Sequence, residues 1–325
     1  MWWEKQVTKQ IGILGTGSAI PERILTNAEL ETMVDTSDEW IVTRTGIRER
    51  RIAGPGDTSA KLAFEASVRA LEAANLQATD LDLIICATVT PDQAFPATAC
   101  LVQERLGVSN IPAFDLSAGC SGFGYGIGAA QALLGTGQYQ RALIIGVDLL
   151  SRITDYSDRS TCVLFGDGAG AVVLGPVPEG YGLLASDLGA DGSGADFLQQ
   201  ENQYIKMSGS EVFKFAVRVM ENSTKRVLNK VGLSTNQIQW VIPHQANIRI
   251  ITAAAARLGI PEERFFVNVD RYGNTSAASI GIAFDELARS GQLQDGDYLV
   301  LVGFGAGLTW SALLLKWWAG DVYEQ

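Results

Sequence analysis

Residues 75–85, NLQATDLDLII, form a polar turn that leads into an apolar run, and their pattern returns later in the chain. Residues 232–242, GLSTNQIQWVI, repeat the turn and the apolar run at an offset of about 157 positions. Each copy follows a stretch with helical spacing, residues 59–74 in the first and residues 211–231 in the second. Repetition at a fixed offset indicates a duplicated structural unit. The sequence therefore predicts an α/β fold built from two similar halves.

A second pair of segments extends the repeat. Residues 111–115 lead through a small-residue loop and an apolar helix to a strand at 142–147, and residues 265–270 lead in the same way to a strand at 298–303. Strands that alternate with helices predict parallel sheets covered by helices. We expect an N-terminal half over residues 1–176 and a C-terminal half over residues 177–325. The carboxyl ends of their strands would face one shared cleft.

Charge and cysteine usage exclude several classes of function. The net charge is −11 and the sequence pI is near 4.7, which argues against nucleic acid and against an anionic membrane surface. The four cysteines show no metal-ligand spacing, so free thiols in a reducing cytoplasm are expected. The uncharged run 298–315 has a glycine-rich centre, which favours two buried strands over a membrane span.

The sequence of 325 residues contains one histidine, His244, which follows the apolar run 240–243. Imidazole is the side chain whose ordinary pKa lies near neutrality, so His244 is the single candidate for histidine acid/base or proton-donor chemistry. A lone histidine also excludes two-histidine zinc sites and Cys-His-His triads built from this chain alone.

The stretch DLSAGCSGF, residues 115–123, places Cys120 at the start of a helix without charged residues. The positive end of a helix dipole lowers the pKa of a thiol, so Cys120 is the candidate nucleophile. Cys86, Cys100 and Cys162 are expected to be packing residues.

Together with PHQAN (243–247), YGNTSAAS (272–279) and GFGAGLTW (303–310), this stretch resembles the β-ketoacyl-acyl carrier protein synthase III family of the thiolase-like superfamily. The likeness spans almost the whole chain. It implies a thiolase-like fold with a five-layer αβαβα core, a cytoplasmic homodimer, and no metal or cofactor beyond a CoA thioester substrate. The implied reaction condenses a short acyl-CoA, with acetyl-CoA expected, with malonyl-acyl carrier protein.

The resemblance also implies a role for individual residues. Cys120, His244 and Asn274 would form the catalytic triad, the amides of Cys120 and Ala306 an oxyanion hole, and Phe304 would line the cleft. The family often has glycine at the position of Ala306, and a positive φ there would make the alanine costly.

Further residues are implied at the substrate path. Trp40 and Arg159 would sandwich the CoA adenine, Phe95 would cross a dimer interface to close the acyl pocket, and the polar segment 189–209 would form a loop near the cleft mouth or the interface. The pantetheine and phosphate path would involve Arg44, Thr36, Asn247 and Phe213, and docking of the acidic carrier protein would involve Arg249 and Arg257. Ser210 stands where family members carry asparagine, which weakens one pantetheine contact.

Two alternatives remain open from the sequence. The chain could be a related condensing or acyl-transferring enzyme of polyketide or secondary metabolism with another primer. It could also be a non-catalytic scaffold that binds carrier protein, although binding alone requires none of the triad residues. A dinucleotide-binding site at Gly12, Gly15 and Gly17 is disfavoured because Pro21 blocks the helix that such a site needs.

Overall fold

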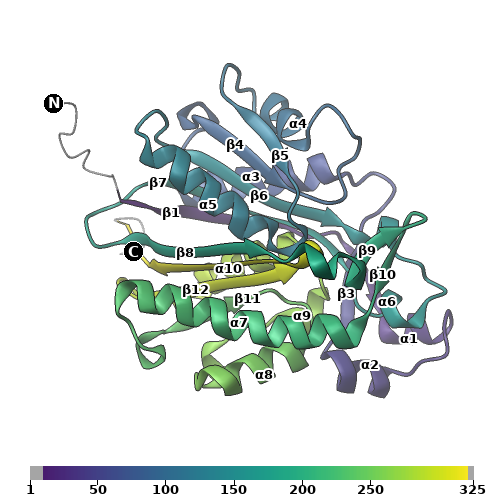
Figure 1. The fold of residues 1–325 in the computed structure, drawn as a ribbon. Coiled ribbons are helices and arrows are strands. Elements are labelled where there is room, and N and C mark those ends of the chain that lie inside the picture. Colours follow the sequence, from purple (N-terminus) through teal and green to yellow (C-terminus); the bar gives the residue numbers. More distant parts are fainter. Residues whose placement is uncertain (1–9, 321–325) are drawn as a thin grey trace.

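The computed structural model describes residues 10–320, and two mixed β-sheets form its core (Figure 1). The strands of the first sheet are, in spatial order, β1 (Ile11–Ala19), β7 (Asp167–Pro176), β6 (Ala142–Leu149), β4 (Leu83–Ala87) and β5 (Ala113–Leu116). β4 is parallel to β5 and β6, whereas β7 is antiparallel to β6 and β1. The expectation of wholly parallel sheets is wrong, because no long crossover helix separates β6 from β7.

The second sheet has four strands. In spatial order they are β11 (Trp240–Pro243), β12 (Tyr298–Gly305), β13 (Thr309–Lys316) and β8 (Gly182–Ala190). β12 and β13 are antiparallel neighbours joined by a short glycine-containing turn, which confirms that the uncharged run 298–315 is a pair of buried strands. Among the described residues, no helix is long and apolar enough to cross a membrane.

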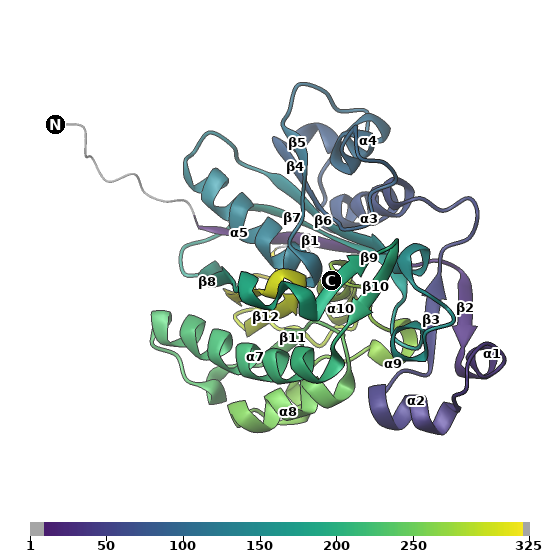
Figure 2. The ribbon, with the colours of Figure 1, turned by 45° about the vertical axis from the view of Figure 1, so that its right-hand side comes forward.

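Helices form three layers around the two sheets (Figure 2). α3 (Ser59–Ala73) and α4 (Thr98–Arg105) cover the outer face of the first sheet, and α5 (Gly122–Gly135) and α10 (Ala278–Arg289) lie between the sheets. α7 (Gly209–Val231), with α8 (Ile248–Leu258) beside it, covers the outer face of the second sheet. The five-layer αβαβα core is confirmed. The central helices carry apolar residues on several faces, as burial between two sheets requires.

The repeat seen in the sequence corresponds to equivalent elements in the two sheets. A short 3-10 turn at Ala78–Asp80 precedes β4, and another at Thr235–Gln237 precedes β11. The chain passes from the first sheet to the second between Pro176 and Gly182. The outermost ends of the proposed halves 1–176 and 177–325 lie outside the described residues, and the division itself stays a prediction.

Smaller elements gather at one end of the layers (Figure 2). They are β2 (Arg23–Thr26), α1 (Asn27–Glu31), α2 (Asp38–Thr45), β3 (Glu49–Ile52), α6 (Arg159–Cys162), β9 (Leu198–Glu201), β10 (Tyr204–Met207) and α9 (Val269–Tyr272). β9 and β10 pair as a hairpin whose two turn residues, Asn202 and Gln203, have φ of 48° and 76°. The expectation of a loop over 189–209 is therefore wrong, since turns of this kind favour hairpins.

The fully buried Arg50 of β3 ties these elements to the core. Its guanidinium donates to the carbonyl oxygens of Leu25 and Val163 and to Oδ1 of Asn27. No carboxylate among the described residues pairs with it, and burial lowers the pKa of Arg50 to about 10.

Candidate active site

The predicted nucleophile lies where two layers meet. Cys120 belongs to a 3-10 turn, Gly119–Ser121, that leads directly into α5. The neighbouring glycine loop approaches it closely: a Cβ on Gly305 would lie 2.4 Å from the backbone nitrogen of Cys120. Small residues around the cysteine are thus a steric requirement of the contact between the two loops.

One cavity of about 510 Å³ joins the predicted triad, since Cys120, His244 and Asn274 all line it. The three side chains come from different places in the chain: the turn before α5, the loop after β11 and the loop after α9. Phe304, at the end of β12, lines the same cavity. The fold therefore brings a thiol, an imidazole and a carboxamide to one shared space.

His244 is fixed by contacts on both sides of its ring. Its backbone N–H donates to Val302 O at 2.8 Å, and its ring packs edge-on against Phe304 with centroids 5.2 Å apart. Nδ1 lies 2.6 Å from Oγ of Ser279. The same oxygen accepts the N–H of Gln245 at 3.5 Å, so Ser279 holds both the imidazole ring and the backbone beside it.

Burial lowers the pKa of His244 to about 3. The imidazole is therefore neutral near pH 7. A neutral imidazole has one nitrogen that donates a hydrogen bond and one that accepts, and donation from the Ser279 hydroxyl to Nδ1 would leave Nε2–H as the donor that faces the substrate.

The carboxamide of Asn274 is oriented by its own loop. Its Oδ1 accepts the backbone N–H of Ser276 at 2.9 Å, which leaves the NH₂ group as the free end of the side chain. The backbone N–H of Asn274 donates to Leu164 O at 2.8 Å. Ser276 has a φ of 50°, a strained conformation of the kind that clusters at functional sites.

The thiol of Cys120 behaves differently from the expectation. It is partly open to the cavity, yet the protein packed around it raises its pKa to about 12 through burial. The prediction that the helix terminus lowers this pKa is wrong, because desolvation of the thiolate is the larger effect. The resting form of Cys120 is consequently the neutral thiol.

The glycine loop accommodates the alanine at position 306. Gly307 has a φ of 115°, whereas Ala306 is not among the residues with positive φ, so its methyl group causes no backbone strain. The nitrogen of Ala306 lies 2.9 Å from the place of a Cβ on Gly119. The Cys120 and Ala306 backbones are thus neighbours, as an oxyanion hole requires.

A second, apolar cavity of about 180 Å³ adjoins Cys120. Its wall contains Val89, Leu150, Phe165 and Ile205, together with Ser276. This space has the size and polarity for a short hydrocarbon group attached to the cysteine sulfur.

Most of the residues predicted to bind CoA or to dock the carrier protein line the large cavity. They are Trp40, Arg44, Phe213, Asn247 and Arg249. The guanidinium carbon of Arg159 lies 4.9 Å from the Trp40 ring centroid, so a flat base can enter between the two side chains only after Arg159 moves. Arg249 stacks on Phe213 at 5.7 Å.

Other predicted residues lie apart from the cavity or have structural partners. Asn247 caps α8 through Oδ1 and donates from Nδ2 to Arg44 O at 3.0 Å. Thr36 does not line either cavity, although its hydroxyl is buried without a partner. Arg257 forms an ion pair with Glu221 at 3.4 Å, and Phe95 is 84% exposed and away from both cavities.

Residue reasoning missed Ser276 and Ser279. Both lie within YGNTSAAS, the motif that contains Asn274, so the signal was present without an assigned role. Within residues 10–320, no group of histidine, cysteine, aspartate and glutamate side chains could hold a metal ion.

The sequence matches two related profiles. One, described as 3-oxoacyl-[acyl-carrier-protein] synthase III, matches residues 114–192, and its C-terminal counterpart matches residues 228–317. The chain is 55% identical to a β-ketoacyl-[acyl-carrier-protein] synthase III of Caldanaerobacter subterraneus, over 94% of this chain and 97% of the relative.

Solved structures agree with the sequence matches. The crystal structure of 3-oxoacyl-[acyl-carrier-protein] synthase III from Aquifex aeolicus superposes with a TM-score of 0.93 and 50% identity, covering 94% of this chain and 100% of that one. The Thermus thermophilus counterpart gives 0.92 and 49%, covering 95% and 100%. Fold and site define a condensing acyltransferase with a thiolase-like fold. The chain belongs to the 3-oxoacyl-[acyl-carrier-protein] synthase III family.

Proposed function

We propose that Cys120, His244 and Asn274 carry out, in this chain, the condensation of an acyl-CoA with malonyl-acyl carrier protein that initiates fatty acid synthesis. The observation that supports these roles is the single cavity of about 510 Å³ that all three side chains line. A nucleophile and two hydrogen-bond donors in one enclosed space are what a decarboxylative condensation needs.

In the first half-reaction, the Cys120 sulfur attacks the thioester carbonyl of acyl-CoA, and CoA leaves. The acyl group then rests on Cys120, with its hydrocarbon part in the apolar cavity of about 180 Å³. The amides of Cys120 and Ala306 donate to the oxyanion, and losing one donor of this kind costs about 3–4 kcal/mol.

In the second half-reaction, malonyl-acyl carrier protein loses CO₂ and an enolate forms. Nε2–H of His244 and the NH₂ group of Asn274 donate hydrogen bonds to the enolate oxygen. These hydrogen bonds strengthen as negative charge develops on that oxygen. The carbanion attacks the acyl group on Cys120. Phe304, 3% exposed and against the imidazole ring, keeps water from this carbanion.

Substrate recognition involves the outer cavity. The CoA adenine stacks between Trp40 and Arg159 after Arg159 moves, and Arg44, Phe213 and Asn247 lie along the pantetheine and phosphate path. A contact between CoA and Thr36, which lines neither cavity, stays a prediction. Arg249 and Arg257 attract the acidic carrier protein, although the chain as a whole has a net charge of −11. The ion pair with Glu221 partly neutralises the charge of Arg257, so few positive charges remain at this docking surface.

The active form of the enzyme is a cytoplasmic homodimer, and each subunit consists of the two halves 1–176 and 177–325. The ring of Phe95 is 84% exposed and touches neither cavity of its own chain, which supports a role in closing the acyl cavity of a second copy. A bulky ring at that place favours acetyl over longer or branched primers.

Mass spectrometry after brief incubation with acetyl-CoA tests the nucleophile, and one acetyl group on Cys120 is expected. His244→Ala and Asn274→Ala should keep this adduct and lose malonyl decarboxylation. Normal decarboxylation by both variants would refute their roles. An unmodified wild-type cysteine would favour a non-catalytic scaffold, and a preference for malonyl-CoA as extender would favour a polyketide-type enzyme.

A further inference from the structure

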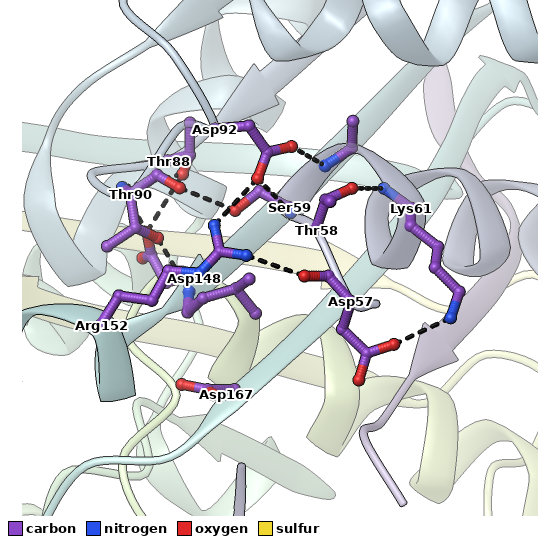
Figure 3. A network of polar contacts seen from close by, with 12 residues as sticks. Asp57, Thr58, Ser59, Lys61, Thr88, Thr90, Asp92, Asp148, Arg152 and Asp167 are labelled. Carbon is purple, nitrogen blue, oxygen red and sulfur yellow. Dashed lines mark hydrogen bonds and ion pairs between the residues drawn. The ribbon is translucent and has the colours of Figure 1, made fainter. Parts of the chain in front are cut away.

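Asp148 is a fully buried carboxyl group to which the proposed mechanism gives no role. It lies near the end of β6, and Figure 3 shows its side chain next to Thr88 and Thr90. Burying a carboxylate is costly unless hydrogen bonds replace its lost hydration. Within the described residues, five hydrogen bonds do so, two from hydroxyl groups and three from backbone N–H groups. The carboxyl group is therefore tied to several parts of the chain at once.

Most of these hydrogen bonds hold the loop after β4. Oδ1 of Asp148 accepts the hydroxyls of Thr88 and Thr90 at 3.1 and 3.0 Å. The same oxygen accepts the backbone N–H of Val89 at 2.8 Å and that of Thr90 at 3.2 Å. Val89 lies in the wall of the apolar cavity of about 180 Å³ beside Cys120. One carboxyl oxygen thus fixes the backbone that carries a wall residue of this cavity.

Two further wall segments depend on the same group. The Thr90 hydroxyl accepts the N–H of Leu149 at 2.8 Å, and the next residue, Leu150, lines the cavity. Oδ2 of the buried carboxyl group accepts the N–H of Ala277 at 3.1 Å, and the preceding residue, Ser276, also lines the cavity. The carboxyl group therefore joins three loops, from distant parts of the sequence, behind one cavity wall.

The loop after β4 is also held from its other side (Figure 3). The carbonyl oxygen of Thr90 accepts the Ser59 hydroxyl at 2.7 Å, and the N–H of Ser59 donates to Asp92 at 2.9 Å. Arg152 forms an ion pair with Asp92 at 3.0 Å and donates to the carbonyl oxygen of Asp57 at 2.7 Å. These contacts join the loop to the start of α3. A longer acyl group can displace this wall only by breaking such supporting hydrogen bonds.

We propose that Asp148 is a positioning residue that fixes the size of the acyl cavity and so limits the length of the acyl group that Cys120 accepts. The proposal rests on the proposed function, in which the acyl group on Cys120 occupies this cavity. Asp148 itself does not line the cavity, so it acts through the loops that it holds. A hydrophobic pocket distinguishes ligands that differ by one methylene group by about 10- to 200-fold. Loss of the support should lower this discrimination.

Two substitutions remove the support without changing a wall residue. In Asp148→Asn the NH₂ group would face a backbone N–H whichever way the amide is turned, because both carboxyl oxygens accept from such groups. Thr90→Val keeps the shape of the side chain and loses the hydroxyl that bonds to Asp148 and Leu149. Thr90→Ser is the conservative variant, because it keeps that hydroxyl.

The quantity to measure is the ratio of kcat/KM for acetyl-CoA to kcat/KM for butyryl-CoA. Both primers carry the same CoA, and a loss of folded enzyme lowers both rates equally, so a purely structural role would leave this ratio unchanged. We expect the ratio to fall about tenfold in Asp148→Asn and in Thr90→Val, because the loosened wall admits the longer chain. In Thr90→Ser the ratio should stay within about threefold of the wild-type value.

Thr16→Val and Asp285→Asn are the matched controls. The Thr16 hydroxyl donates to the buried carboxyl group of Asp285 at 2.8 Å, and neither residue lines the two cavities at Cys120. Their ratios should stay within about threefold of the wild type. An unchanged ratio in Thr90→Val overturns the proposal even if Asp148→Asn does not fold, and so does an equal fall in Thr90→Ser or in Thr16→Val. A wild-type protein that neither primer acylates refutes the proposed function instead.

Discussion

Gly305 and Cys120 are in such close contact that a Cβ on the glycine would lie 2.4 Å from the backbone nitrogen of the cysteine. That nitrogen is one of the two proposed oxyanion donors. A methyl group must therefore push the glycine loop away from the place where the charge develops.

We expect Gly305→Ala to reduce acetylation of Cys120 by about a hundredfold or more, the effect of losing one oxyanion donor. Ala306→Gly is the matched variant in the same loop, and it should retain the wild-type rate within about threefold because only the backbone amide is used. Quenched-flow mass spectrometry gives both rates. Equal acylation by Gly305→Ala and the wild type would contradict the proposed oxyanion hole.

Ser279→Ala should disturb the tautomer of His244. Without the hydroxyl at 2.6 Å from Nδ1, the ring hydrogen can occupy either nitrogen, and decarboxylation should fall about tenfold. Since the chain has one histidine, a single pair of imidazole ¹⁵N resonances reports the tautomer directly. Ser279→Thr should restore both the resonances and the rate. An unchanged Nε2–H signal in Ser279→Ala would refute this positioning role.

Stability should respond to acid through His244. Its pKa is lowered to about 3 in the folded protein from an ordinary 6.5, so the unfolded chain binds the additional proton between these values. The contribution of neutral His244 to the free energy of unfolding is fully present above pH 6.5 and is lost as the pH falls from 6.5 towards 3. At pH 5 the loss is about 2 kcal/mol. Denaturant unfolding at pH 5 and 7 measures it. His244→Gln should show a smaller difference between the two pH values, and an identical difference would contradict neutral burial.

Arg50→Met should destabilise the protein by about 3 kcal/mol, because Asn27 Oδ1 and two carbonyl groups would stay buried without their donor. Arg23→Met is the control, since Arg23 is exposed and forms a surface ion pair with Glu29 at 3.5 Å. Its effect should stay within about 1 kcal/mol. Thermal denaturation compares the two, and equal midpoints would show that Arg50 is not essential to this region.

Trp40→Ala should raise KM for acetyl-CoA about tenfold with little change in kcat, because stacking on the adenine is remote from the reacting carbon. Acetyl-pantetheine, which lacks the adenine, should react equally with both proteins. A matching loss with acetyl-pantetheine would place Trp40 elsewhere on the substrate path.

The sequence was most informative where a local pattern determines local structure. The turn and strand repeated at 75–85 and 232–242 became equivalent elements in the two sheets, and Cys120 was correctly placed at the beginning of a central helix. The large cavity then joined it to His244 and Asn274. These predictions depend on periodicity and motifs, which a single sequence contains.

Predictions failed where distant side chains decide the outcome. Residues 265–270 match residues 111–115 in the sequence repeat, yet the first half has strand β5 at this place, whereas only Phe265 forms a bridge in the second half and the N–H of Asn268 donates to Oε1 of Gln245 at 3.0 Å. The raised pKa of Cys120 likewise depends on how several layers enclose the sulfur. Neither the amide partner nor the enclosure is encoded in neighbouring residues.

The route of the chain between the two sheets has an evolutionary consequence. Each sheet presents its loops to the same cavity, but the sulfur comes from one set of loops and the imidazole and carboxamide come from the other. An ancestor with a single αβ unit could have assembled such a cavity only by associating with its own copy. Joined in one chain, the two units need not stay identical: under the proposed roles one holds the primer and the other generates the carbon nucleophile.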